Sequence, residues 1–272
     1  MAITGSGTQN DPWIVTTYAE LVGKAVDGGF VKVGNDINIT DEYPDGGMPP
    51  LLISNTDIDG DGKVISNWLY GGQNRTIEST DSSDTTSQIH DLTIRNIIIK
   101  DNANSFCKRA EDNDSRPFFV NCNISGVSYV PLTSDSSSTL RFKNCSINCD
   151  LKNQKPFGDK GGVFDSCYVI MKSTVNTNFF MDLYGKTAKD SYFELNLPNI
   201  TRLDAYSMGF ENCVLDVTSN ASFGVGGGTS DVSIINTTHA PNCNPDGTNV
   251  KGVSDANWLD AAYLSSIGFD VG

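Results

Sequence analysis

The sequence predicts an all-β chain that folds as a parallel β-helix, and two observations support this prediction. First, a pattern of apolar–x–Asn–x–x–apolar recurs eight times at steps of 22 to 29 residues. Second, the segments between its occurrences are short, rich in Val, Ile, Thr and Phe, and broken by Gly, Asn, Asp and Ser. Strands and turns at this period are typical of a solenoid with one coil per repeat. A leucine-rich repeat would need regularly spaced leucines and a helical stretch, and these repeats have neither.

The Asn-type position of each repeat is predicted to be a corner of its coil. The residue two before it is apolar, and so usually are the residues one and three after it. A straight strand would direct positions −2 and +1 to opposite faces, so both point inward only if the chain turns between them. Asn suits such a turn because it tolerates the left-handed backbone region. The predicted corners are Asn67, Asn96, Asn121, Asn144, Ser166, Asp190, Asn212 and Asn236.

The same counting predicts columns of side chains along the rod. Position +1 points inward, where cysteine acts as a small apolar residue; four coils place a cysteine there, namely Cys122, Cys145, Cys167 and Cys213. Position −1 points outward, and its charges alternate in sign on consecutive coils, as neighbouring strands prefer. These charged residues are Lys143, Asp165, Lys189 and Glu211.

Position +2 also points outward and provides the predicted interface. Tyr168, Tyr192 and Val214 occupy it on three successive coils and would form an exposed apolar strip. Such a strip could stack on sugar rings or pack against an identical chain. Two isolated exposed tyrosines would need neither partner.

A helix is predicted near each end of the chain. Thr17–Glu20 is a capping box that opens a short helix through about Val26, where Gly28 and Gly29 stop it. Near the other end, Ser254 or Asp255 can cap a helix that ends at Gly268. The prediction is therefore one domain over residues 1–272, with an N-terminal cap and first strands at 1–50, coils at 51–250 and a C-terminal cap at 251–272.

Composition excludes some classes of partner. The formal net charge is −14, which argues against binding of nucleic acid or of an anionic membrane surface. No stretch approaches the roughly 20 apolar residues of a membrane span. Residues 1–6 lack the basic start and apolar run of a signal peptide, so we expect synthesis in a cytoplasm and free thiols at the seven cysteines.

Two candidate metal or catalytic features remain near residue 60 and at the histidines. Asp57, Asp59 and Asp61 copy the first half of an EF-hand calcium loop, but its twelfth position is Trp68 rather than Glu. The same segment is also an ordinary tight turn, so both interpretations stay open. The chain has two histidines, His90 and His239, and we expect a structural role for His239 in the inward +3 column. We expect no cofactor.

A polysaccharide-cleaving β-helix would need paired carboxylates across a groove, or a calcium cluster with a basic residue. Asp182, Lys186, Arg202 and Asp204 lie between the sixth and seventh corners and could share a surface. This set is the candidate catalytic cluster if the chain is an enzyme. A solvated loop would have the same composition.

Segments at both ends carry a family resemblance. Residues 18–37, with Gly28-Gly29-Phe30-Val31-Lys32-Val33, look like an opening lid and first strand, and residues 58–65 look like a first full coil. The chain resembles the right-handed parallel β-helix proteins of the pectate-lyase-like group. Residues 263–270 are similar to segments of virion proteins of tailed bacteriophages. The secreted lyases carry a signal peptide and a calcium cluster with a basic catalytic residue, none of which is matched here.

This resemblance favours a non-enzymatic virion protein: an exposed capsid decoration, a head fibre, or a tail fibre or adhesin. It implies synthesis in the host cytoplasm, incorporation into the virion, a homotrimeric state, and contacts with capsid or tail proteins and with a host glycan. Two alternatives are a polysaccharide depolymerase or lyase and a carbohydrate-binding bacterial surface protein. Fold alone does not decide among them.

Overall fold

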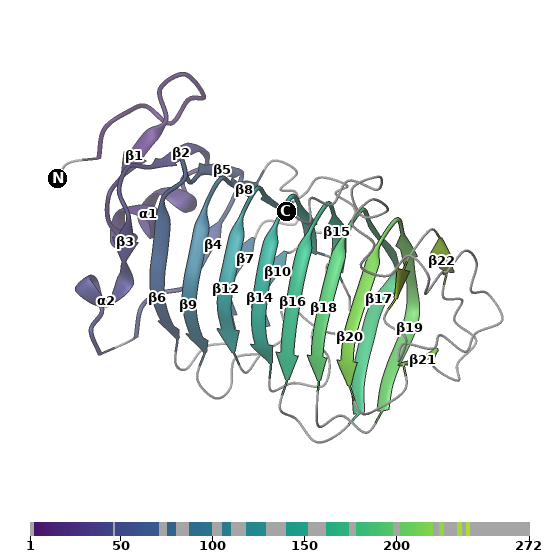
Figure 1. Cartoon of the computed structure of the whole chain (residues 1–272). Coiled ribbons are helices and arrows are strands. Elements are labelled where there is room, and N and C mark those ends of the chain that lie inside the picture. The colour runs from purple at the N-terminus through teal and green to yellow at the C-terminus, as the bar shows by residue number, and fades with distance from the viewer. Residues whose placement is uncertain are drawn as a thin grey trace.

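The structure of the protein is a computed structural model. The residues that it describes are 3–45, 47–70, 75–79, 87–99, 105–109, 118–128, 140–151, 162–173, 178–197, 202–219, 223–225, 233–235 and 238–239. Two helices occur in these ranges, α1 (Tyr18–Ala25) and α2 (Ile39–Glu42), and both lie at the N-terminal end of the molecule (Figure 1).

The described strands form two long sheets and one short sheet, and every pairing between them is parallel. The 11-stranded sheet contains β1 (Trp13–Val15), β2 (Gly29–Val33), β5 (Thr56–Asp59), β8 (Gln88–His90), β11 (Phe119–Val120), β13 (Leu140–Lys143), β15 (Gly162–Asp165), β17 (Asn178–Lys189), β19 (Arg202–Glu211), β21 (Phe223–Val225) and β22 (Ser233–Ile235). The 9-stranded sheet contains β3 (Ile37–Asn38), β6 (Val64–Tyr70), β9 (Thr93–Ile99), β12 (Asn123–Ser128), β14 (Ser146–Leu151), β16 (Tyr168–Ser173), β18 (Tyr192–Leu197), β20 (Val214–Ser219) and β23 (Thr238–His239). The short sheet contains β4 (Leu51–Ile53), β7 (Arg75–Ser79) and β10 (Ser105–Arg109).

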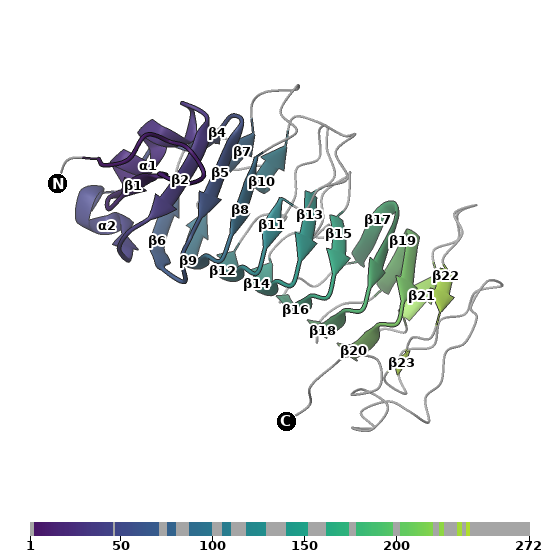
Figure 2. The ribbon, with the colours of Figure 1, turned by 90° about the horizontal axis from the view of Figure 1, so that it is seen from above.

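Strands that follow one another in the sequence alternate between the sheets. From β11 to β20, each strand of the 11-stranded sheet is followed by one of the 9-stranded sheet. Each repeat therefore makes one coil and stacks on the coil before it, as Figures 1 and 2 show. This arrangement confirms the predicted parallel β-helix.

The corners between the two long sheets have the predicted left-handed backbone. Five predicted corners have φ between +47° and +56°: Asn121, Asn144, Ser166, Asp190 and Asn212. Side-chain amides also join corners on neighbouring coils. Asn144 Nδ2 donates to Asn121 Oδ1 at 3.2 Å, and Asn212 Nδ2 donates to Asp190 Oδ1 at 3.1 Å. We call this row of residues the corner ladder.

The first two predicted corners were wrong. His90 pairs with Val120, so the residue level with Asn121 is Asp91, which has φ +53° and accepts the Asn121 amide at 3.0 Å. Asn67 and Asn96 instead lie level with each other inside β6 and β9. Asn67 also has a left-handed φ of +58°, and its amide bonds to another strand residue. A local sequence pattern cannot distinguish these two kinds of left-handed position. Asn236, the last predicted corner, lies outside the described residues.

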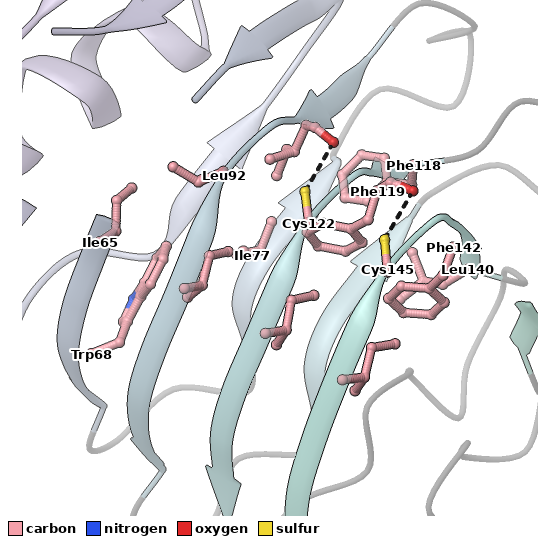
Figure 3. Close-up of a cluster of buried hydrophobic side chains, with 14 of the residues drawn as sticks. Ile65, Trp68, Ile77, Leu92, Phe118, Phe119, Cys122, Leu140, Phe142 and Cys145 are labelled. Carbon is pink, nitrogen blue, oxygen red and sulfur yellow. Dashed lines mark hydrogen bonds between the residues drawn. The ribbon is translucent and has the colours of Figure 1, made fainter. Parts of the chain in front are cut away.

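Aromatic rings and thiols fill the interior between the sheets (Figure 3). The rings of Phe119, Phe142 and Phe164 stack nearly parallel, with centroids 5.3 and 5.2 Å apart. The predicted inward cysteines are all buried and free, and two of them are drawn in Figure 3 with their thiols on carbonyls of the preceding coil. Ser191 occupies the same column, and its hydroxyl accepts from Cys167 N at 3.0 Å.

The N-terminal cap forms as predicted, with one addition. Thr17 is the N-cap of α1, and its side chain accepts from Glu20 N at 3.2 Å. Glu20 reaches back one residue further than a capping box requires, to the amide of Thr16 at 2.7 Å. The unpredicted helix α2 supplies Glu42, which accepts from the first amides of α1, including Ala19 N at 2.9 Å. The predicted C-terminal helix lies outside the described residues.

Replacement of Asn144 tests the corner ladder. Asn144→Ala should destabilise the protein by about 2 kcal/mol, because alanine resists the left-handed region and the amide bond is lost. Asn144→Gly loses the same bond but adopts this φ freely. We therefore expect the glycine variant to be the more stable in urea denaturation, the reverse of the usual order. An alanine variant as stable as the glycine variant would contradict a left-handed corner at this position.

Candidate functional site

The corrected phase of the first coils places His90 in the outward charged column. In the sheet, Asp59 of β5 lies level with Lys32 of β2 on one side and with His90 of β8 on the other. Beyond Val120, the column continues through the predicted alternating charges. The last two of these form an ion pair, with Lys189 Nζ 2.7 Å from Glu211 Oε2. The column therefore contains two alternating runs separated by Val120, one of Lys32, Asp59 and His90 and the other of Lys143, Asp165, Lys189 and Glu211.

His90 is surrounded by three carboxylates. Its Nε2 lies 2.9 Å from Asp57 Oδ1, and its Nδ1 lies 2.9 Å from Asp91 Oδ2 and 3.7 Å from Asp59 Oδ1. The Asp57 Oδ1 atom is buried and has no aligned hydrogen bond, so its contact with the ring is an ion pair of poor hydrogen-bond geometry. We call these four residues the His90 cluster.

Two of the carboxylates are held in place by neighbouring groups. Asp91 accepts the Asn121 amide on Oδ1, which leaves Oδ2 facing the imidazole. Asp59 Oδ1 accepts from the backbone N–H of Asp61 at 2.8 Å, inside the turn that joins β5 to β6. The side chains around the ring are thus positioned by the corner ladder and by a tight turn.

The carboxylates change the charge state of the imidazole. The contact with Asp57, together with those to Asp91 and Asp59, raises the pKa of His90 to about 9 despite partial burial. In return, His90 and the Asn121 amide lower the pKa of Asp91. At neutral pH the cluster is therefore an imidazolium between carboxylates, with a net negative charge.

Open space lies on both sides of the cluster. A groove of about 450 Å³ runs along the corner ladder and is lined by Asp59, Asp61, Gly62, Asp91, Leu92, Thr93 and Asn121. A smaller depression of about 180 Å³ lies toward the N-terminal cap and is lined by Gln9, Pro12, Phe30, Val31, Asp57, Asp59 and His90. Asp59 lines both, so a small ligand or ion can reach it from either side.

The structure separates the three predicted aspartates. Asp57 and Asp59 face His90, whereas Asp61 pairs with Lys32, Nζ to Oδ1, at 3.1 Å. The turn interpretation also holds, because Lys63 N donates to Gly60 O at 2.8 Å. His90 was not among the residues predicted for this site. The signal was the 30-residue separation of Asp91 and Asn121, which aligns His90 with Val120 in the outward column, and Asp59 lies one coil earlier, 31 residues before His90.

Of the predicted exposed strip, Tyr168 is exposed, Tyr192 is half-buried and Val214 is buried. The rings of Tyr168 and Tyr192 meet edge to face, with centroids 5.1 Å apart, and Tyr168 is 41% exposed. Tyr168 Oη donates to Glu194 Oε2 at 3.0 Å. Val214 has no exposed surface, so the prediction that it extends an exposed strip was wrong. The strip consists of a tyrosine pair beside a carboxylate.

The other candidate residues are placed only by their backbones. Asp182 and Lys186 lie on β17, and Arg202 and Asp204 lie on the adjacent strand β19. Asp182 is level with Tyr206, whereas Asp204 is level with Phe180. The four side chains lie outside the described part of the structure, so their clustering stays a prediction. The backbone of His239 pairs with Leu215, in the predicted column.

Two of the buried thiols, Cys213 and Cys149, are kept protonated by burial. Burial raises the pKa of Cys213 to about 12 and also raises that of Cys149. A thiol that stays protonated is a weak nucleophile and a weak metal ligand. These cysteines therefore act as small core residues.

Comparison with protein-family models, with curated proteins and with solved structures finds no match to this chain. Within the described residues, no helix has the length and apolar character needed to cross a membrane.

The raised pKa of His90 predicts a pH-dependent stability. The imidazolium contribution is fully present below about pH 6.5, the unfolded value, and is lost as pH rises through about 9. In urea denaturation in metal-free buffer, His90→Gln should be about 1–2 kcal/mol less stable than the wild type at pH 6, since partial exposure screens the pairs. This difference should disappear near pH 10. A difference that is the same at both pH values would show that His90 stabilises the fold by packing rather than by charge.

Proposed function

We propose that this chain is a non-enzymatic structural component of a virion, an exposed head decoration or fibre or a tail fibre or adhesin, which assembles as a homotrimer. The virion setting comes from the resemblance of residues 263–270 to segments of tailed-phage virion proteins. The observation that carries the proposal is the contact of the exposed Tyr168 with the half-buried Tyr192, beside the alternating charges on the rod. The partners would be other copies, capsid or tail proteins, and a host glycan.

Charge favours this surface for contact between copies. Each chain carries a net charge of −14, so copies repel one another over most of their surface. Along the charged column, Lys143 and Lys189 balance Asp165 and Glu211 on consecutive coils. This column is therefore neutral in sum, so a second acidic chain can approach it at a lower electrostatic cost than a surface of like charges.

The tyrosine pair supplies apolar area at the same place. Tyr168 and Tyr192 lie at position +2 of their coils, directly across the corner ladder from the charged column. Tyrosine gives a large contact area with few rotatable bonds and is enriched at protein interfaces. Their strands, β16 and β18, pair over five residues in regular register, so the surface is rigid before contact.

The interface is tested by replacing both rings. Tyr168→Ser with Tyr192→Ser should convert a trimer to monomer in light scattering, because the apolar contact is lost while the inward residues are untouched. The matched double replacement by Phe keeps the rings and should remain trimeric. Circular dichroism checks that both variants fold. A wild-type monomer across the micromolar range, or a Ser variant that stays trimeric, would reject the tyrosine interface.

A second candidate function is cleavage of a polysaccharide. The observation that favours it is the groove along the corner ladder, because Asp59, Asp91 and the Asn121 amide line an open channel in which a glycan chain could lie. Carboxylates across a groove can provide acid and base catalysis on a glycosidic bond.

This alternative predicts a product from a glycan panel. Release of reducing ends or unsaturated sugars should be lost in Asp91→Asn if the groove is the active site, and in Asp204→Asn or Arg202→Ala if the β17–β19 cluster is. Tyr168→Phe, which removes a hydroxyl far along the rod, is the control and should keep full activity. Absence of product from every glycan would reject the enzymatic function.

A further inference from the structure

We propose that Asp59, His90 and Asp91 bind a divalent transition-metal ion such as Mn²⁺ or Zn²⁺. Water from the groove along the corner ladder would complete the coordination. This site is separate from the tyrosine interface and does not depend on the proposed assembly. Asp57 and Asn121 would act as supports that orient the ligands.

The distances between the ligand atoms suit one shared ion. A carboxylate oxygen from each Asp and a ring nitrogen of His90 all lie within 4.8 Å of one another. Two ligands at bond lengths of about 2.1 Å are about 3.0 Å apart at a right angle and about 3.4 Å apart at the tetrahedral angle. The Nδ1 distances of 2.9 Å to Asp91 and 3.7 Å to Asp59 bracket these values. Small side-chain rotations would therefore complete the site.

The outer partners match those of a metal-binding histidine. Such a histidine gives its second ring nitrogen to a carboxylate, which fixes the tautomer and the ring orientation. Asp57 Oδ1 is buried 2.9 Å from Nε2 and can accept its N–H after a small rotation. The ion would displace the proton on Nδ1, and the Nδ1 lone pair would then face Asp59 and Asp91. The Asn121 amide holds one oxygen of Asp91 and leaves the other for the ion.

The ligand types and the local charge select the class of ion. Four carboxylates, those of Asp57, Asp59, Asp61 and Asp91, surround the site, and Lys32 forms an ion pair with one of them, Asp61. One imidazole with two carboxylates and open positions suits Mn²⁺, Fe²⁺ or Zn²⁺. Ca²⁺ prefers six to eight oxygen ligands, so a nitrogen ligand disfavours it.

Calorimetric titration of the full chain with MnCl₂, ZnCl₂ and CaCl₂ at one fixed pH tests the proposal. We expect saturable binding of one Mn²⁺ or Zn²⁺ per chain and weaker or no binding of Ca²⁺. Because the ion would join β5 to β8, it should also raise the Tm. No saturable binding up to about 1 mM, or tighter binding of Ca²⁺ than of Mn²⁺, would overturn the proposed site.

Variants locate the ion. His90→Gln should abolish binding, and Asp57→Asn, which keeps all three ligands, should weaken it 10–100-fold. Asp61→Asn removes a neighbouring carboxylate that is not a ligand and should leave the affinity within about threefold. If Asp61→Asn weakens binding as much as Asp59→Asn does, the ion follows local charge and the assigned ligand set is wrong. Circular dichroism and the metal-free Tm of each variant verify that it is folded.

Discussion

The left-handed corner is the constraint on which the rest of this rod depends. From Asp91 to Asp190, the backbone N–H of each corner donates to the carbonyl just before the next corner, as from Asn121 to Lys143 at 2.9 Å and from Asp190 to Glu211 at 3.0 Å. Asn, Asp and Ser hold the positive φ that most residues avoid. Because the corner repeats at one phase, the residues at positions −2, +1 and +3 are buried on each coil from the corner at Asp91 to the corner at Asp190. The phenylalanine stack and the thiol column are consequences of that phase.

The chemistry of the corner ladder changes along the rod, and the His90 cluster results from that change. Between Asn144 and Asn121 the bond joins two amides. One step earlier the acceptor is the carboxylate of Asp91, which has a second oxygen to offer. That oxygen faces His90, whose position in the outward column is set by the same register. A structural ladder and a charged site therefore share one residue.

The sequence could predict features that depend on the repeat, but not those that depend on where its first coils begin. The cysteine column, the N-terminal helix and the alternating charges follow from counting along one strand and corner. Asn67 fits the same sequence pattern as a corner and also has a left-handed φ of +58°, but it lies within β6. The corner of that coil was therefore assigned to the wrong residue. Only the pairing of strands about 30 residues apart shows that Asn67 is not the corner of its coil, and that the left-handed residue before it is Asp61. The burial of Val214 and the contact of Glu42 with α1 likewise come from distant parts of the chain.

The positions of the two candidate surfaces fit the mechanics of a solenoid. A coil near an end has fewer neighbours, so it frays more readily than a central coil. The His90 cluster links β5 to β8 near the N-terminal cap, and Lys32 of β2 pairs with Asp61 beside it. Charge contacts, and the proposed ion, thus lie where stacking alone is weakest. The tyrosine pair lies between coils that are paired on both sides, where a rigid surface suits docking.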